Sequence, residues 1–170
     1  MYLLAEFQRA GDAKIAPGFM FDVMICGPWF CTLHAISFSM GQGGKVKVFG
    51  RKGSWTDSRT SPEGWQELAI GDPTLIAGQN RLQLPRGEAT MLGPYAVMGI
   101  YLTFLEGADQ MSYSDKTSQT NHKVLSEHRT LSDGMRLLCL KGRVSGAQPF
   151  SVGTHGEDRF FVGQIEYSLE

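Results

Sequence analysis

Short segments in which apolar and polar residues alternate run along almost the whole chain, separated by glycine and proline turns. A period of two is typical of half-buried β-strands, because successive side chains of a strand point to opposite faces. The segment Thr32 to Met40, for example, places Ile36 and Phe38 on one face and serines on the other. The 21 glycines and 7 prolines among 170 residues favour many short strands over long helices. The sequence therefore predicts an all-β fold.

The turn residues divide the chain into about ten expected strands. The most apolar one, Tyr95 to Leu105, is predicted to lie in the centre of a sheet. Lys45 to Phe49 alternates charged and apolar residues, and the turn Gly41 to Gly44 before it predicts a hairpin with the preceding strand. For Asn121 to Arg129 a short helix is the alternative. The other expected strands are Phe19 to Ile25, Trp65 to Ile70, Arg81 to Leu84, Met111 to Ser114, Val124 to Ser126, Met135 to Lys141 and Phe160 to Leu169.

The length of the chain fits a single domain over residues 1–170, with no repeat, linker or low-complexity tract to divide it. We expect two packed antiparallel sheets, which form a jelly-roll-like β-sandwich. The expected core residues share the apolar faces of these strands: Phe21, Val23, Ile36, Phe38, Val46, Val48, Trp65, Leu68, Tyr101, Phe161 and Ile165.

The closing segment, Arg159 to Leu169, has a nearly continuous apolar face. Phe161, Gly163, Ile165 and Tyr167 share that face, and the opposite face becomes polar towards its end. Because a β-sandwich depends on pairing between distant segments, we expect this strand to pair with one from the first half of the chain.

Charge and hydropathy exclude two classes of partner. The 16 Lys and Arg residues balance 17 Asp and Glu residues, so the net charge of -1 offers no field for nucleic acid or an anionic membrane. No apolar run approaches the ~18 residues of a membrane span. The opening Met1 to Phe7 is too short for the apolar part of an export signal. Three cysteines leave at least one free thiol, which favours an intracellular location, although the compartment stays open.

Seven short motifs follow one another in a distinctive order. They are MFDV at 20–23, ISF at 36–38, VKVFG with KGS at 46–54, GWQEL at 64–68, YLT at 101–103, MSYS at 111–114 and RFFVGQIEY at 159–167. In this order the chain resembles an uncharacterised β-sandwich module of large bacterial and marine algal proteins. The resemblance spans Gly18 to Ser168 and implies a jelly-roll-like sandwich without known catalytic residues. It carries no functional site across to this chain.

The residues that could support catalysis or metal binding lack the required spacing. Four residues separate Cys26 from Cys31, and the second ligand pair of a zinc site is missing; the two are either free thiols or, in an oxidising compartment, disulfide partners. No serine lies in a G-x-S-x-G turn. We therefore expect no enzyme, no cofactor and no metal. The weaker candidates are His34, His122, His128 and His155 for zinc, and Asp57, Glu63 and Asp72 for a structural calcium, with solvated loop acids as the alternative.

Aromatic residues are the remaining indication of function. The polar loop Arg51 to Gly64 surrounds Trp55, which predicts an exposed indole. With Trp29, Trp65, Tyr101 and Tyr113 it could form a stacking platform for sugars, with core packing as the alternative for Trp29 and Trp65. The predicted ligand or partner contacts are Trp55, Trp29, Arg51 and Asp57.

The function expected from these features is structural. The sequence predicts a non-catalytic module that associates with copies of itself or with a protein scaffold, because a sandwich offers strand edges and loops for contact. A carbohydrate-binding module that uses exposed aromatic residues is the alternative. Neither reading identifies the partner, the sugar or the symmetry of an assembly.

Overall fold

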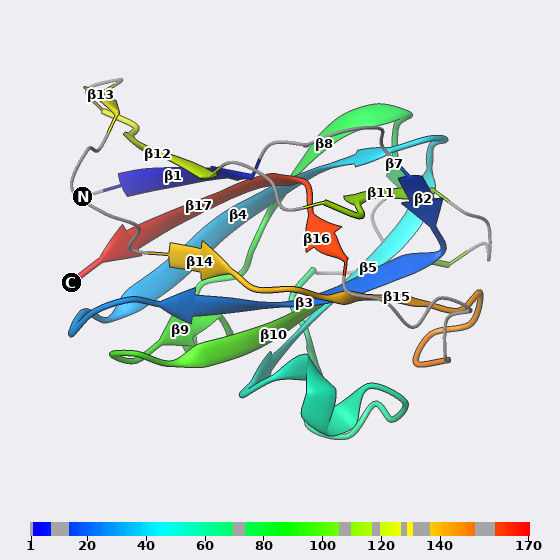
Figure 1. Ribbon diagram of the computed structural model, residues 1–170, viewed down its shortest axis with the longest axis horizontal. Helices are drawn as coiled ribbons and strands as arrows, with labels where there is room; N and C mark the ends of the chain where they lie inside the picture. Colours follow the sequence, from blue (N-terminus) through cyan, green and yellow to red (C-terminus); the bar gives the residue numbers. More distant parts are fainter. Residues whose placement is uncertain are drawn as a thin grey trace.

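A computed structural model describes residues 2–7, 14–69, 74–105, 110–116, 120–126, 129–130, 137–151 and 159–170 of the chain. Within these ranges the regular structure is β-strand apart from two short 3-10 helices, η1 (Trp55–Ser58) and η2 (Glu88–Thr90). No helix in the described part of the chain is long and apolar enough to cross a bilayer. Two antiparallel sheets pack face to face, which confirms the predicted all-β sandwich (Figure 1).

The first sheet holds the two ends of the chain side by side. Its main strands, in order across the sheet, are β1 (Tyr2–Phe7), β17 (Gly163–Leu169), β4 (Cys31–Met40) and β8 (Gly78–Gln83). Smaller strands extend this sheet: β12 (Thr120–Val124) and β13 (Arg129–Thr130) beyond β1, β9 (Met91–Leu92) beside β4, and β11 (Met111–Ser114), β2 (Lys14–Ala16) and β16 (Phe160–Phe161) next to the end of β4.

The second sheet is built around the most apolar segment of the chain. Its main strands, in order, are β3 (Gly18–Ile25), β10 (Val97–Phe104), β5 (Gly44–Lys52) and β6 (Gln66–Glu67). The strand β10 pairs with β3 on one side and β5 on the other, so the predicted central strand is confirmed. The short strands β14 (Leu137–Cys139) and β15 (Arg143–Ser145) pair with β3, and β7 (Thr74–Leu75) pairs with β5.

The order of the main strands is that of a jelly roll. In chain order these strands are β1, β3, β4, β5, β6, β8, β10 and β17. The first of these strands pairs with the last, the second with the second-last, and so on inward along the chain: β1 with β17, β3 with β10, β4 with β8, and β5 with β6. This nested pairing wraps a folded-over ribbon around one core, as the jelly-roll prediction requires.

The predicted hairpin of the Lys45 to Phe49 strand with its predecessor is wrong. The preceding strand β4 belongs to the first sheet and β5 to the second, so the chain crosses the sandwich at residues 41–43. Both strands bury an apolar face in the same interior, but from opposite layers. Alternation along each strand cannot distinguish this arrangement from a hairpin, because both place the same residues in the core.

The core lies between the two sheets and is rich in aromatic rings. Phe21 of β3 stacks on Phe161 of β16 with ring centroids 4.4 Å apart. Every residue predicted for the core is buried except Trp65, which is half-buried. Trp65 and Tyr101 belong instead to a second cluster on the outer face of the second sheet, which also contains Met20, Phe49, Trp55 and Phe150.

The short elements differ most from the sequence prediction. The expected strand Trp65 to Ile70 is reduced to β6, and Ile70 lies outside the described residues, as does Met135. Over Asn121 to Arg129 the described residues form β12 and β13, so the helical alternative is wrong. The sequence does not predict β1, which is ordered by its partners β12 and β17.

The predicted pairing of the closing segment with the first half of the chain is confirmed. Between β1 and β4, β17 places Ile165 opposite both Ala5 and Ile36. Glycine at position 163 permits this contact, because a Cβ there would lie 2.1 Å from the carbonyl oxygen of Ser37. A register shift between Glu166 and Tyr167 keeps Tyr167 buried despite an extra residue on β4.

Truncation before Arg159 is expected to give insoluble or molten protein. It removes β16 and β17, and thereby uncovers the apolar interior beneath β17, opens the pairing edges of β1 and β4 and breaks the first sheet in two. Size-exclusion chromatography and a thermal melt followed by circular dichroism would measure this. A soluble truncated chain with an unchanged cooperative melt would contradict it and would make the closing segment an appended arm.

Candidate functional site

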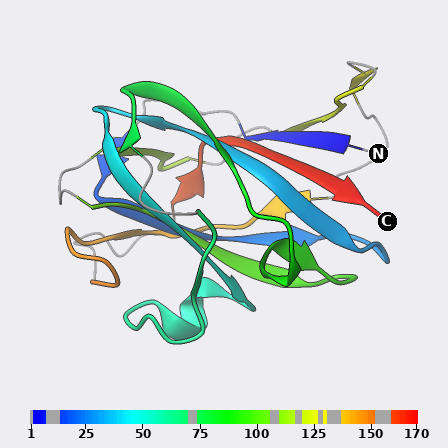
Figure 2. The same ribbon diagram turned by 180° about the vertical axis from the view of Figure 1, so that it is seen from behind.

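The structure buries Trp55, so the prediction of an exposed indole is wrong. Trp55 begins η1, which covers the outer face of the second sheet (Figure 2). Asp22 of β3 holds this turn, since its carboxylate accepts hydrogen bonds from Ser54 Oγ at 2.6 Å and from the backbone N–H of Trp55 at 2.8 Å. The indole Nε1 donates to the carbonyl of Lys141 at 3.4 Å. The polar groups around Trp55 therefore form hydrogen bonds within the protein, and only 8% of Trp55 remains exposed.

Trp65 and Arg51 also lie at the second cluster. The guanidinium carbon of Arg51 lies 5.9 Å from the centroid of the Trp65 ring. Trp65 donates its indole N–H to the carbonyl of Ser58 at 2.8 Å and packs edge-on against Tyr101. Asp57 is exposed on η1. Arg51 thus lies near the end of β5, and Trp55 and Asp57 lie on η1 shortly after it, but the Trp55 ring that was predicted to bind a ligand is buried.

Tyr101 and Tyr113 do not supply that ligand surface either, because both are buried. The hydroxyl of Tyr101 donates to Ser145 Oγ at 3.0 Å and accepts the backbone N–H of Phe150 at 3.2 Å. Trp55, Tyr101 and Tyr113 of the predicted sugar platform are therefore packed inside the protein. This leaves Trp29 as the remaining predicted contact.

Trp29 lies in a different place, on the loop between β3 and β4. It is half-buried, and its ring occupies the space that a side chain on Gly27 would need. Its neighbour Phe30 is 55% exposed, and Tyr95, on the loop between β9 and β10, is 65% exposed. The two loops meet, since the N–H of Tyr95 donates to the carbonyl of Gly27 at 3.1 Å. We call the exposed surface formed by Trp29, Phe30, Met91 and Tyr95 the aromatic end.

Backbone hydrogen bonds hold the aromatic end in place. Phe30 exchanges two of them with Glu170, at 3.1 and 2.9 Å, so the surface lies beside the C-terminus, on the left of Figure 1. Tyr95 has a φ of 57°, a left-handed conformation that costs a non-glycine residue about 1 kcal/mol. An exposed ring held in a strained conformation is more typical of a binding surface than of a passive turn.

A repeated dipeptide in the sequence signals this surface, although it is not one of the predicted functional motifs. A Gly-Pro pair precedes an aromatic residue on both loops, at 27–28 before Trp29 and at 93–94 before Tyr95. Proline restricts the backbone, and glycine lets it turn, so this pair presents the following side chain on a tight loop. The two loops lie far apart in the sequence, and only the fold makes them neighbours.

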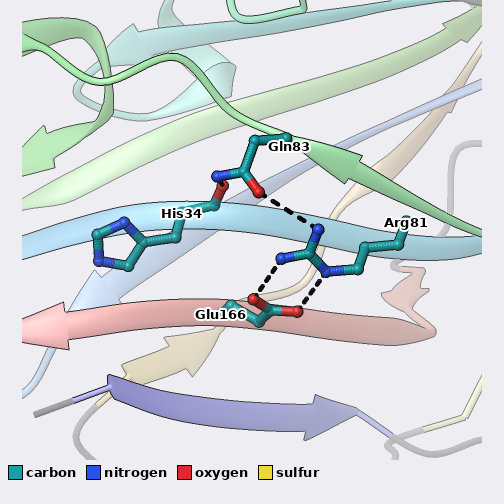
Figure 3. Close-up of polar contacts among 4 residues, drawn as sticks. All are labelled: His34, Arg81, Gln83 and Glu166. Carbon is teal, nitrogen blue, oxygen red and sulfur yellow. Dashed lines mark hydrogen bonds and ion pairs between the residues drawn. The ribbon is translucent and has the colours of Figure 1, made fainter.

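A polar network covers the adjoining outer face of the first sheet (Figure 3). Arg81 of β8 forms a two-point ion pair with Glu166 of β17, with Nε–Oε1 and Nη2–Oε2 distances of 2.6 Å. Nη1 of Arg81 also donates to Gln83 Oε1 at 3.3 Å, and Gln83 Nε2 donates to the carbonyl of His34 at 2.8 Å. Four planar polar side chains are thus presented in fixed orientations across three strands.

The polar network continues to the aromatic end. His34 Nε2 lies 2.8 Å from Ser168 Oγ, and the Tyr2 ring, which is 54% exposed, packs against the imidazole at 4.9 Å. Burial, and to a smaller extent the charge of Arg86, lowers the pKa of His34, so its ring is neutral at neutral pH. The strand register places Tyr2, Ser168, Thr32 and Met91 in one row across the sheet.

A hollow of about 240 Å³ lies further along the same face of the first sheet. Glu6, Ser39, Gln79 and Gln164 contribute polar groups to it. Gln164 Nε2 donates to Glu6 Oε1 at 3.0 Å, and Glu6 also pairs with Lys123 at 2.8 Å. The outer face of the first sheet is therefore rich in hydrogen-bonding groups.

The candidate metal ligands do not come together in the described residues. They contain no group of three or more His, Cys, Asp or Glu side chains that could hold a metal ion. Asp72, His128 and His155, which were candidate ligands, lie outside them. All three cysteines are unpaired, and burial raises the pKa of Cys31 to about 12, so this thiol stays protonated.

Comparisons with family models, with curated proteins and with solved structures find no match for this chain. The resemblance to the bacterial and algal β-sandwich module therefore stays a prediction. The aromatic end and the polar network therefore provide the evidence on function.

The Glu166→Gln variant is expected to lower stability by about 0.5 to 1 kcal/mol near neutral pH, because the pair with Arg81 is partly solvent-exposed, with side-chain exposures of 49% for Arg81 and 20% for Glu166. Hydrogen bonds from Arg81 lower the pKa of Glu166 below its ordinary value of about 4.3. A depressed carboxyl pKa contributes stability above the ordinary value, and this contribution is lost as the pH falls through the folded pKa. Urea unfolding of both proteins at several pH values measures the difference.

The matched control is Glu63→Gln, which changes an exposed carboxylate on the loop after η1. This variant should track the wild type at every pH. A stability difference between wild type and Glu166→Gln that is the same at neutral and at strongly acidic pH would contradict the prediction.

Proposed function

We propose that this protein is a non-catalytic β-sandwich module with a structural role, which associates with copies of itself or with a protein scaffold through its aromatic end. The observation that carries the proposal is the exposure of Phe30 and Tyr95 on two loops that are bonded to each other, and of Met91 on the neighbouring strand β9. Aromatic and methionine side chains are enriched at protein interfaces, where each buries a large apolar area.

The rigidity of the two loops supports association with a protein surface. Ile25 donates to the carbonyl of Ala96, and Ala96 donates to the carbonyl of Gly93, both at 3.1 Å. Rings held in this way lose little conformational freedom on binding, which increases affinity for a given contact area. The net charge of -1 adds almost no repulsion between copies of the chain.

Self-association should appear as a mass that rises with protein concentration in size-exclusion chromatography with light scattering. The Tyr95→Asn and Phe30→Ser variants should each shift the protein towards monomer, because they remove an exposed ring from the aromatic end. Asparagine tolerates the left-handed backbone at position 95, so the first variant keeps the loop conformation.

The matched control is Ile76→Ser. Ile76 is 70% exposed and lies between β7 and β8, at the end of the sandwich opposite the termini in Figure 1. Its substitution should leave the assembly unchanged. A wild-type protein that stays strictly monomeric at high concentration would contradict self-association, and equal effects of all three variants would contradict the assignment to the aromatic end.

Carbohydrate binding is a second candidate, and the polar network favours it. Sugars are recognised by planar polar side chains that bond adjacent hydroxyls, beside an aromatic ring on which the sugar stacks. Arg81, Gln83, Glu166 and His34 are such planar groups, and the exposed Tyr2 ring lies next to them. This surface replaces Trp55 as the basis of the carbohydrate proposal.

Glycan-array binding tests this second candidate. Gln83→Ala and Tyr2→Ala should each weaken any glycan signal about tenfold or more, because one removes bonds to hydroxyls and the other a stacking ring. Trp55→Phe should not weaken it, since Trp55 is buried on the other sheet. A glycan signal that disappears with Trp55→Phe in a folded protein, or no signal from the wild type, would contradict the assignment.

A further inference from the structure

A hollow of about 600 Å³ lies on the outer side of the second sheet, and its lining contains no residue of the aromatic end or of the polar network. It is bounded by η1 on one side and by the segment that follows β14 on the other. Its walls are mainly apolar and include Trp55, Leu140 and Phe160. Its volume falls in the range of small-molecule sites, which are commonly apolar with a few fixed polar groups.

Asp22 contributes a carboxylate to this hollow. The residue is 6% exposed, and each of its oxygens already accepts one hydrogen bond, from Ser54 Oγ and from the backbone N–H of Trp55. These bonds fix the orientation of the carboxylate and leave one lone pair on each oxygen for another donor. Among the described residues no Lys, Arg or His forms an ion pair with Asp22.

Burying the Asp22 carboxylate is costly, and burial accordingly raises its pKa, whereas the nearby charges of Asp57 and Arg51 act on it more weakly and in opposite directions. A ligand that brought a positive charge would offset part of this cost. A bare metal ion is a poor fit, because Asp22 is the single carboxylate of the lining and the remaining walls are mainly apolar. The Trp55 and Phe160 rings favour instead a cation with an apolar part, through cation–π attraction and apolar burial.

We propose that this hollow binds a small organic ammonium compound, with the ammonium group at Asp22 and the apolar substituent against Trp55 and Phe160. Lys141 lies at the rim, exposed, with its carbonyl bonded to the Trp55 indole. The site involves neither the aromatic end nor the polar network, so it is independent of the proposed function.

Three probes of similar shape and different charge test the proposal on the full-length protein: benzylammonium, benzyl alcohol and benzoate. Isothermal titration calorimetry at neutral pH should show benzylammonium binding about tenfold more tightly than benzyl alcohol, and benzoate more weakly still. Equal binding of benzylammonium and benzyl alcohol would overturn the assignment to a cation. Tighter binding of benzoate, or no binding of benzylammonium at millimolar concentration, would overturn it as well.

A variant of Asp22 then tests whether the ammonium group binds at this carboxylate. Asp22→Asn keeps an acceptor for the Trp55 N–H and should abolish the preference for benzylammonium over benzyl alcohol. Because Asp22→Asn also affects the turn at η1, its fold is checked by a thermal melt, and the comparison of the three probes on the wild-type protein remains informative if the variant does not fold.

The matched control is Glu63→Gln, which removes an exposed carboxylate from the loop after η1, outside the lining of the hollow. This variant should bind all three probes as the wild type does. A loss of the ammonium preference with Glu63→Gln would overturn the assignment to Asp22, and so would an unchanged preference in a folded Asp22→Asn protein.

Discussion

The pairing of β17 with both β1 and β4 is the interaction on which the rest of the structure depends. It joins the last strand of the chain to the first and closes the nested order of the jelly roll. It also brings Glu166 beside Arg81, and Ser168 beside His34, from segments far apart in the sequence. Without this strand neither the closed core nor the polar network of the first sheet could form.

Asp22 has a similar role for the second sheet at a smaller scale. Its two hydrogen bonds hold η1 against the sheet, and this contact buries Trp55 with Tyr101 and Phe49 in the second cluster. The aromatic residues are thereby divided into two groups. Those near η1 stabilise the fold, whereas Phe30 and Tyr95, on the loops between β3 and β4 and between β9 and β10, remain exposed and support the proposed association with a protein surface.

The candidate surfaces lie close together but differ in chemistry. The aromatic end presents apolar rings and suits a protein surface, while the adjoining polar network presents fixed hydrogen-bonding groups and suits a hydroxyl-rich ligand. The row from Tyr2 to Met91 connects them across the first sheet. A binding module that uses both would contact a partner with its loops and the neighbouring half of one sheet.

The sequence by itself determined the all-β class, the central position of β10 and the strand character of the closing segment, because alternation and turn residues act locally. It could not show that β4 and β5 belong to opposite sheets, since a hairpin and a crossover bury the same residues. Nor could it show that Trp55 is buried, because that depends on Asp22, which is distant in the sequence. Exposure of Phe30 and Tyr95 likewise depends on which loops the fold makes neighbours. The tertiary structure alone decided these points, because burial and exposure are set by contacts between distant segments.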